Sequence, residues 1–223
     1  MTNGAPSRAA TPDPEMRDGG FLKRAVLDVA GGRPYRHALF YQFPGGLRFE
    51  LSERGDALSL VLTALRKALA VCSDLFSERP TVIVHLQPIT PSSGFALRRT
   101  LRELDAAGVA IPRQRHVWCD SNDELSDRET GFLVHCVFEV PVAMVQNLLW
   151  CALVLDFPGL RPNPQCQIYL VDPVSRVIVH PYDDRGMDVV CGEPAVLQAL
   201  YEKHQHWLLD YDRAAMDLTF GCS

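Results

Sequence analysis

The hydrophobic positions of the chain follow two periods, one typical of helices and one typical of strands. Segments with apolar residues at helical spacing alternate with short β-branched or alternating runs. The predicted helices cover residues 21–30, 56–77, 90–107, 141–156 and 194–208, with a last helical turn or two at 214–220. The predicted strands cover residues 37–43, 47–51, 81–86, 114–119, 132–140, 165–171, 176–179 and 189–191.

Turn residues predict a hairpin near each end of the chain. Residues 44–46, Pro-Gly-Gly, join the first two strands, and glycine supplies the positive φ that a tight turn needs. Residues 172–175 join the strands at 165–171 and 176–179, with proline at the second position, as a type I turn prefers.

This order of elements predicts a single α+β domain over residues 21–223. We expect a mainly antiparallel mixed sheet with hairpins at both ends and helices packed on one face. Residues 1–20 are rich in Ala, Pro, Ser, Thr and Gly without apolar periodicity, which is typical of a flexible N-terminal tail.

Composition narrows the class of protein. A chain of 223 residues with 47% hydrophobic content can bury a sizeable core. A pI near 5.8 without any basic run argues against nucleic acid as a partner. The longest apolar run, at 148–155, is too short to span a membrane. Seven scattered cysteines without a C-x-x-C motif, and no secretory leader, indicate a cytoplasmic protein with reduced thiols.

Negative charge is concentrated in residues 179–220. This segment holds eight of the 27 acidic residues and three of the 22 Lys and Arg, so its net charge equals the −5 of the whole chain. An acidic surface steers a basic partner and raises its association rate. We therefore expect a partner-binding surface made of Tyr182, Asp183, Asp184, Arg185, Asp188, Trp207, Asp210 and Asp212.

Two other interpretations compete for the same residues. A hard cation such as Mg²⁺ needs several converging oxygen ligands, and His180, Asp183, Asp184 and Asp188 are the candidates for such a site. A purely structural role is the third interpretation, because Asp-Asp-Arg-Gly is good turn chemistry and Arg185 is a ready ion-pair partner.

Known catalytic motifs are absent from the sequence. It contains no G-x-S-x-G elbow, phosphate-binding loop, dinucleotide fingerprint or H-E-x-x-H, so we assign no catalytic residue and expect no cofactor. His135 and Cys136 are neighbours on a predicted strand and point to opposite faces, so they cannot act as a pair. Cys191 is a faint nucleophile candidate, for which a buried inert thiol is the favoured interpretation.

Two polar clusters stay open to more than one interpretation. The acidic loop at 120–130 resembles a calcium loop in composition but lacks the ligand spacing. The predicted helix at 90–107 carries Arg98, Arg99 and Arg102 on one side, which indicates a solvated face or, alternatively, an anion or partner site.

The C-terminal third resembles a known family. The motifs are Tyr182-Asp183-Asp184-Arg185-Gly186-Met187-Asp188-Val189, Leu200-Tyr201, Trp207-Leu208-Leu209-Asp210-Tyr211-Asp212-Arg213 and Met216-Asp217, with Leu39-Phe40-Tyr41 and Leu47-Arg48-Phe49-Glu50 nearer the N-terminus. They are similar to the bacterial domain of unknown function family 3885, over about His37 to Phe220. The resemblance implies a small cytosolic protein and assigns no catalytic residues.

The leading functional hypothesis is a non-enzymatic protein-binding module. One example of such a module is an immunity or antitoxin protein, which would neutralise a basic toxin or effector domain through the acidic surface. The alternative is a metal-dependent hydrolase or nuclease that uses Asp183, Asp184 and Asp188. A structural subunit of a larger assembly is the third hypothesis.

Overall fold

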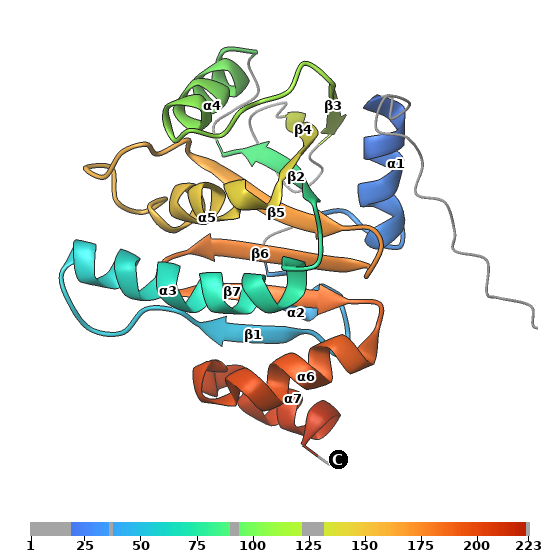
Figure 1. Ribbon diagram of the computed structural model, residues 1–223, viewed down its shortest axis with the longest axis vertical. Coiled ribbons are helices and arrows are strands. Elements are labelled where there is room, and N and C mark those ends of the chain that lie inside the picture. Colours follow the sequence, from blue (N-terminus) through green and yellow to red (C-terminus); the bar gives the residue numbers. More distant parts are fainter. Residues whose placement is uncertain (1–18, 36–37, 90–93, 122–131, 222–223) are drawn as a thin grey trace, which may run out of the picture.

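A seven-stranded antiparallel sheet forms the centre of the computed structural model, which describes residues 19–35, 38–89, 94–121 and 132–221 (Figure 1). Its strands are β1 (Leu47–Glu50), β2 (Thr81–Pro88), β3 (Arg115–Ser121), β4 (Phe132–Pro141), β5 (Cys166–Asp172), β6 (Val177–Asp183) and β7 (Gly186–Cys191). They lie in the order β1-β7-β6-β5-β2-β4-β3, and every neighbouring pair is antiparallel. With its helices the sheet makes one α+β domain, which confirms the predicted fold class.

The hairpin predicted near the C-terminal end is confirmed. The Asp172 carboxylate closes the turn between β5 and β6 by accepting from the backbone N–H of Val174 at 2.9 Å and of Ser175 at 3.2 Å. The last strand begins at Gly186, earlier than the prediction, and therefore forms a second hairpin with β6.

The hairpin predicted near the N-terminus is wrong. Residues Leu39–Gln42 form the short helix α2, and β1 pairs with β7 instead, which places Arg48 opposite Asp188. The backbone N–H of Phe40 donates to the Asp188 carboxylate at 3.1 Å. A strand far along the chain thus takes the place that residues 37–43 were predicted to fill, and its Asp188 forms an ion pair with Arg48.

Helices cover both faces of the sheet, whereas the sequence indicated one face. The larger core lies under α3 (Ala57–Phe76), α5 (Val145–Leu153) and α6 (Pro194–His204), and a second core lies under α1 (Gly19–Val29) and α2 (Figure 1). The central strands explain the difference, because β2 and β5 are buried almost continuously and so need cover on both sides. The other helical segments are α4 (Gly94–Ala106), α7 (Arg213–Phe220), η3 (Val142–Met144), η4 (Gln205–Trp207) and η5 (Asp210–Asp212).

The long helix α3 begins as predicted, but not all of its apolar side chains are buried. The Asp56 side chain caps it by accepting from the backbone N–H of Ser59 at 3.0 Å. Leu58 and Leu62 are exposed although they are apolar, while Lys67 is buried and donates to the Glu50 carbonyl at 3.3 Å.

Two predictions fall on segments outside the description. Residues 1–18 of the predicted tail lie outside it, and Gly19 and Gly20 belong to α1. Residues 122–130 of the acidic loop also lie outside it. Among the helices that are described, none has the length and apolar content needed to cross a membrane.

Candidate functional site

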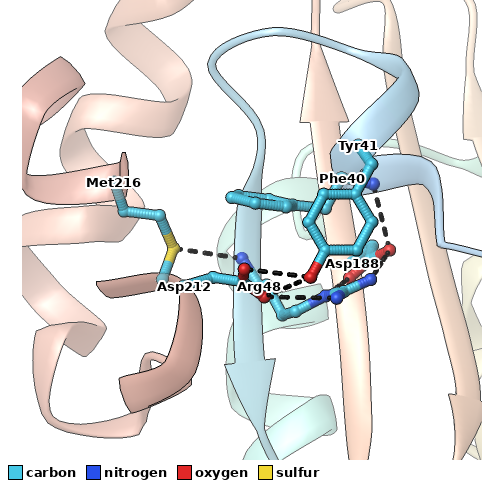
Figure 2. A network of polar contacts seen from close by, with 6 residues as sticks. All are labelled: Phe40, Tyr41, Arg48, Asp188, Asp212 and Met216. Carbon is cyan, nitrogen blue, oxygen red and sulfur yellow. Dashed lines mark hydrogen bonds and ion pairs between the residues drawn. The ribbon is translucent and has the colours of Figure 1, made fainter. Parts of the chain in front are cut away.

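Two of the predicted site residues meet around Arg48 at the β1 edge of the sheet (Figure 2). The buried guanidinium donates to both oxygens of Asp188, at 2.7 Å from Nε and 3.0 Å from Nη2. Its Nη1 donates to Asp212 at 3.2 Å. We call Arg48, Asp188 and Asp212 the Arg48 cluster. A single cation holds two acids of the C-terminal segment inside the fold.

Aromatic rings enclose this cluster. The guanidinium carbon of Arg48 lies 5.3 Å, 4.6 Å and 5.8 Å from the ring centres of Phe40, Tyr41 and Tyr182. The hydroxyl of Tyr41 donates to the Asp212 carboxylate, with oxygens at 3.0 and 3.2 Å. Burial opposes the charge, but the hydrogen bonds and the charge of the carboxylate opposite raise the pKa of Arg48. Arg48 therefore stays charged, and the cluster ties α2, β1, β7 and η5 together.

The acidic turn between β6 and β7 is also satisfied from within the chain. Asp183 is buried and accepts from the backbone N–H of Arg185 at 2.8 Å and from its Nε at 3.0 Å. Asp184 is buried against Ser52, and burial raises the pKa of Asp184. The exposed guanidinium of Arg185 also lies 3.3 Å from Asp156. This geometry is the turn chemistry that the structural interpretation expected.

Gly186 allows this hairpin to close. A Cβ at this position would lie 2.0 Å from the Tyr182 hydroxyl and 3.0 Å from the Phe49 carbonyl oxygen. Gly186→Ala is expected to lower the free energy of unfolding by about 1–3 kcal/mol, because the half-buried ring of Tyr182 must move. Chemical denaturation measures the loss. Gly159→Ala, whose Cβ meets nothing within 4 Å, is the matched control, and an equal loss in both variants would contradict this account.

The four residues of the alternative metal site point to different partners. The Nε2 atom of His180 lies 2.7 Å from the side-chain oxygen of Gln167, and its ring stacks on Tyr169 at 4.2 Å. Asp183 and Asp188 face their arginines, as described above. Across the described ranges, no group of three or more His, Cys, Asp or Glu converges to hold a metal ion.

A buried imidazole chain, which the sequence analysis missed, lies near the other edge of the sheet. Nε2 of His85 is 2.9 Å from Nδ1 of His135, and Nε2 of His135 is 3.2 Å from the Asp120 carboxylate. The Trp118 ring stacks on His135 at 4.6 Å. Burial lowers the pKa of His135 to about 4, and burial together with the neighbouring imidazoles also lowers the pKa of His85 well below its ordinary value. Both rings are therefore neutral near pH 7. In the sequence, the only indication of this polar face of β4 was that His135 and Cys136 are neighbours on a strand and point to opposite sides.

The remaining predicted residues lie at the surface. Asp210 is exposed, and Trp207 is half-buried between the rings of His204 and His206, at 5.0 and 4.7 Å. Tyr182 is half-buried beside Arg48. The predicted acidic surface is thus divided into buried and exposed parts.

Large apolar side chains near Asp210 are exposed, and the sequence analysis did not single them out. Tyr211 is 86% exposed and Leu218 is 81% exposed. With the exposed Ala215 they follow one another at spacings of four and three residues along η5 and α7, and Ala215 and Leu218 share one side of α7. We call Tyr211, Ala215 and Leu218 the C-terminal stripe. Tyr41, 61% exposed, lies close by, since its hydroxyl donates to Asp212, the residue next to Tyr211.

The two thiols considered as nucleophiles are both packed. Cys136 is buried in the larger core, on the face opposite His135, as predicted. The thiol of Cys191 donates to the Ser175 carbonyl at 3.2 Å and accepts from the Glu193 N–H at 3.2 Å. Burial raises the pKa of Cys191, so its thiol stays protonated.

Comparison with known proteins gives one match. No curated protein and no solved structure matches the chain. Residues 26–212 match the family described as Domain of unknown function (DUF3885), a span that contains every strand of the sheet and the whole Arg48 cluster. Since the match extends over most of the sequence, the chain belongs to this family of domains of unknown function (DUF3885).

Proposed function

We propose that this protein is a non-enzymatic protein-binding module whose partner docks on the C-terminal stripe. The observation that carries the proposal is the exposure of Tyr211 and Leu218, at 86% and 81%, in the same C-terminal segment. Exposed tyrosine is a typical energetic anchor of protein interfaces. Trp207, Asp210 and Tyr41 flank the stripe and extend the proposed interface.

Rigid support beneath the stripe favours this function. Met216 and Phe220, on the other side of α7, are buried in the core. The Leu209 N–H donates to the Arg48 carbonyl at 2.9 Å, and the Arg48 N–H contacts the sulfur of Met216 at 3.3 Å (Figure 2). A preformed surface loses little conformational freedom on binding, so more of its contact energy contributes to affinity.

The charge beside the stripe favours a basic partner. Asp210 is exposed and has no ion-pair partner in the part of the chain that is described. A basic toxin or effector domain is the partner class that we propose. We place the protein in the cytoplasm, since the described cysteines are free thiols.

Affinity purification from the source cells with mutant baits tests this proposal. The baits are the wild-type chain, Tyr211→Ala, Leu218→Asp and the control Phe95→Asp, which alters an apolar side chain on α4 that is 78% exposed. We expect a stoichiometric partner with the wild type and the control, and its loss with both stripe variants.

The dissociation constant of the re-purified complex gives the quantitative readout. A hot-spot residue contributes about 2 kcal/mol or more, so Tyr211→Ala is expected to weaken binding by about 30-fold. A partner that binds both stripe variants as tightly as the wild type would contradict the proposal.

A further inference from the structure

A cavity of about 300 Å³ is lined by residues of α4 and of the loop 155–165 that follows α5. Helix α4 lies at the end of the molecule opposite to α7 (Figure 1). Two arginines line it, Arg99 from α4 and Arg161 from the loop, together with the polar residues Thr100, Asn163 and Gln165. Among the lining residues of the described chain there is no carboxylate. The cavity is therefore a concave surface with two arginines, of which Arg161 lies 3.7 Å from the Glu103 carboxylate.

Hydrogen bonds hold its polar wall rigid. The buried Asn163 amide donates to the Val154 carbonyl at 2.6 Å, and the Gln165 amide donates to the Leu155 carbonyl at 2.9 Å. The Thr100 hydroxyl donates to the Pro164 carbonyl at 3.0 Å, which joins α4 to the loop. The side-chain donors of Asn163, Gln165 and Thr100 already bind backbone carbonyls, so the guanidinium groups of the two arginines are the donors that can bind a ligand.

The positive charge of Arg99 is not neutralised locally. Its natural partner one turn along the helix is Glu103. The Glu103 carboxylate instead accepts from the Asn163 backbone N–H at 2.9 Å and lies 3.7 Å from the exposed Arg161, a loose ion pair. Within the described segments Arg99 has no ion pair.

We propose that this cavity binds the phosphate class of anion, as free phosphate or as the phosphate group of a small metabolite. The planar donor fork of a guanidinium matches phosphate oxygens in a bidentate way. The cavity volume is at the lower end of the range for small-molecule sites. The inference is independent of the proposed partner, because it concerns the opposite end of the sheet.

Isothermal titration at constant ionic strength tests this site, with inorganic phosphate and ribose 5-phosphate as probes. We expect at least one probe to bind with a Kd below about 1 mM. Arg99→Gln and Arg161→Gln should each weaken that probe by about tenfold or more, which corresponds to about 1.4 kcal/mol. Tighter binding of the ester would assign the site to a metabolite, and tighter binding of the inorganic ion would assign it to free phosphate.

The matched control is Arg102→Gln, which removes the same charge from the same helix outside the cavity lining. It should change the Kd by less than about twofold, and unchanged melting temperatures should show that all three variants fold. Weaker binding than about 1 mM for both probes would overturn the proposal. An equal effect of Arg102→Gln and Arg99→Gln would also overturn it, because binding would then depend on the overall positive charge of α4 and not on this cavity.

Discussion

Replacing Arg48 with methionine is expected to lower the free energy of unfolding by about 3–5 kcal/mol. The reason is the position of its partners, since Asp188 and Asp212 are buried and share this one guanidinium. Without it, two carboxylates stay buried without a counter-charge, whereas methionine fills much of the same volume. Urea denaturation at pH 7, followed by tryptophan fluorescence, measures the loss.

The control is Arg54→Met, which removes an exposed arginine and should change the free energy of unfolding by less than about 0.5 kcal/mol. Adding Asp188→Asn to Arg48→Met should recover part of the loss, because one uncompensated charge is removed. A loss below about 1 kcal/mol in the single variant would show that the cluster contributes little, as exposed ion pairs do.

Acidification is expected to destabilise the protein through His135. Its pKa falls from 6.5 to about 4 on folding, mainly because the ring is buried. The unfolded chain therefore binds a proton at a higher pH than the folded chain does. The contribution of the neutral His135 ring to the free energy of unfolding is fully present above about pH 6.5, and it decreases progressively toward pH 4. Each pKa unit corresponds to about 1.4 kcal/mol, so about 3 kcal/mol is lost at pH 4.

Comparison with His135→Gln isolates this contribution. Carboxylates also titrate between pH 5 and 4, and their effect is common to both chains. We expect the free energy of unfolding of the wild type to fall by about 3 kcal/mol more than that of the variant between pH 7 and pH 4. Parallel pH profiles would mean that His135 does not titrate differently in the folded protein.

The elements that bury one regular face could be predicted from the pattern of apolar positions. The strand at 132–140 alternates apolar and polar side chains, and the helix at 57–76 begins at a capping aspartate. The prediction failed at residues 37–43, where an aromatic run next to Pro-Gly-Gly looked like half of a hairpin. There a distant strand provides the pairing that β1 uses, and local propensity carries no information about it.

The candidate site could be predicted less well than the fold. Charge density located the segment around Asp188 and Asp212, but it could not show that both carboxylates are buried. Their cation, Arg48, is 140 residues before Asp188 and 164 before Asp212. The exposure of Tyr211 could not be predicted either, because a single aromatic residue between two aspartates is compatible with a core position and with a surface position.

We propose that the buried acids maintain the fold while the exposed stripe contacts the partner. The Kd of the re-purified complex tests it directly when Tyr211→Ala is compared with Asp184→Asn, a change in the buried acidic turn. We predict that Tyr211→Ala weakens binding by about 30-fold and that Asp184→Asn leaves the Kd unchanged. Loss of binding in Asp184→Asn, with full affinity in Tyr211→Ala, would contradict the claim.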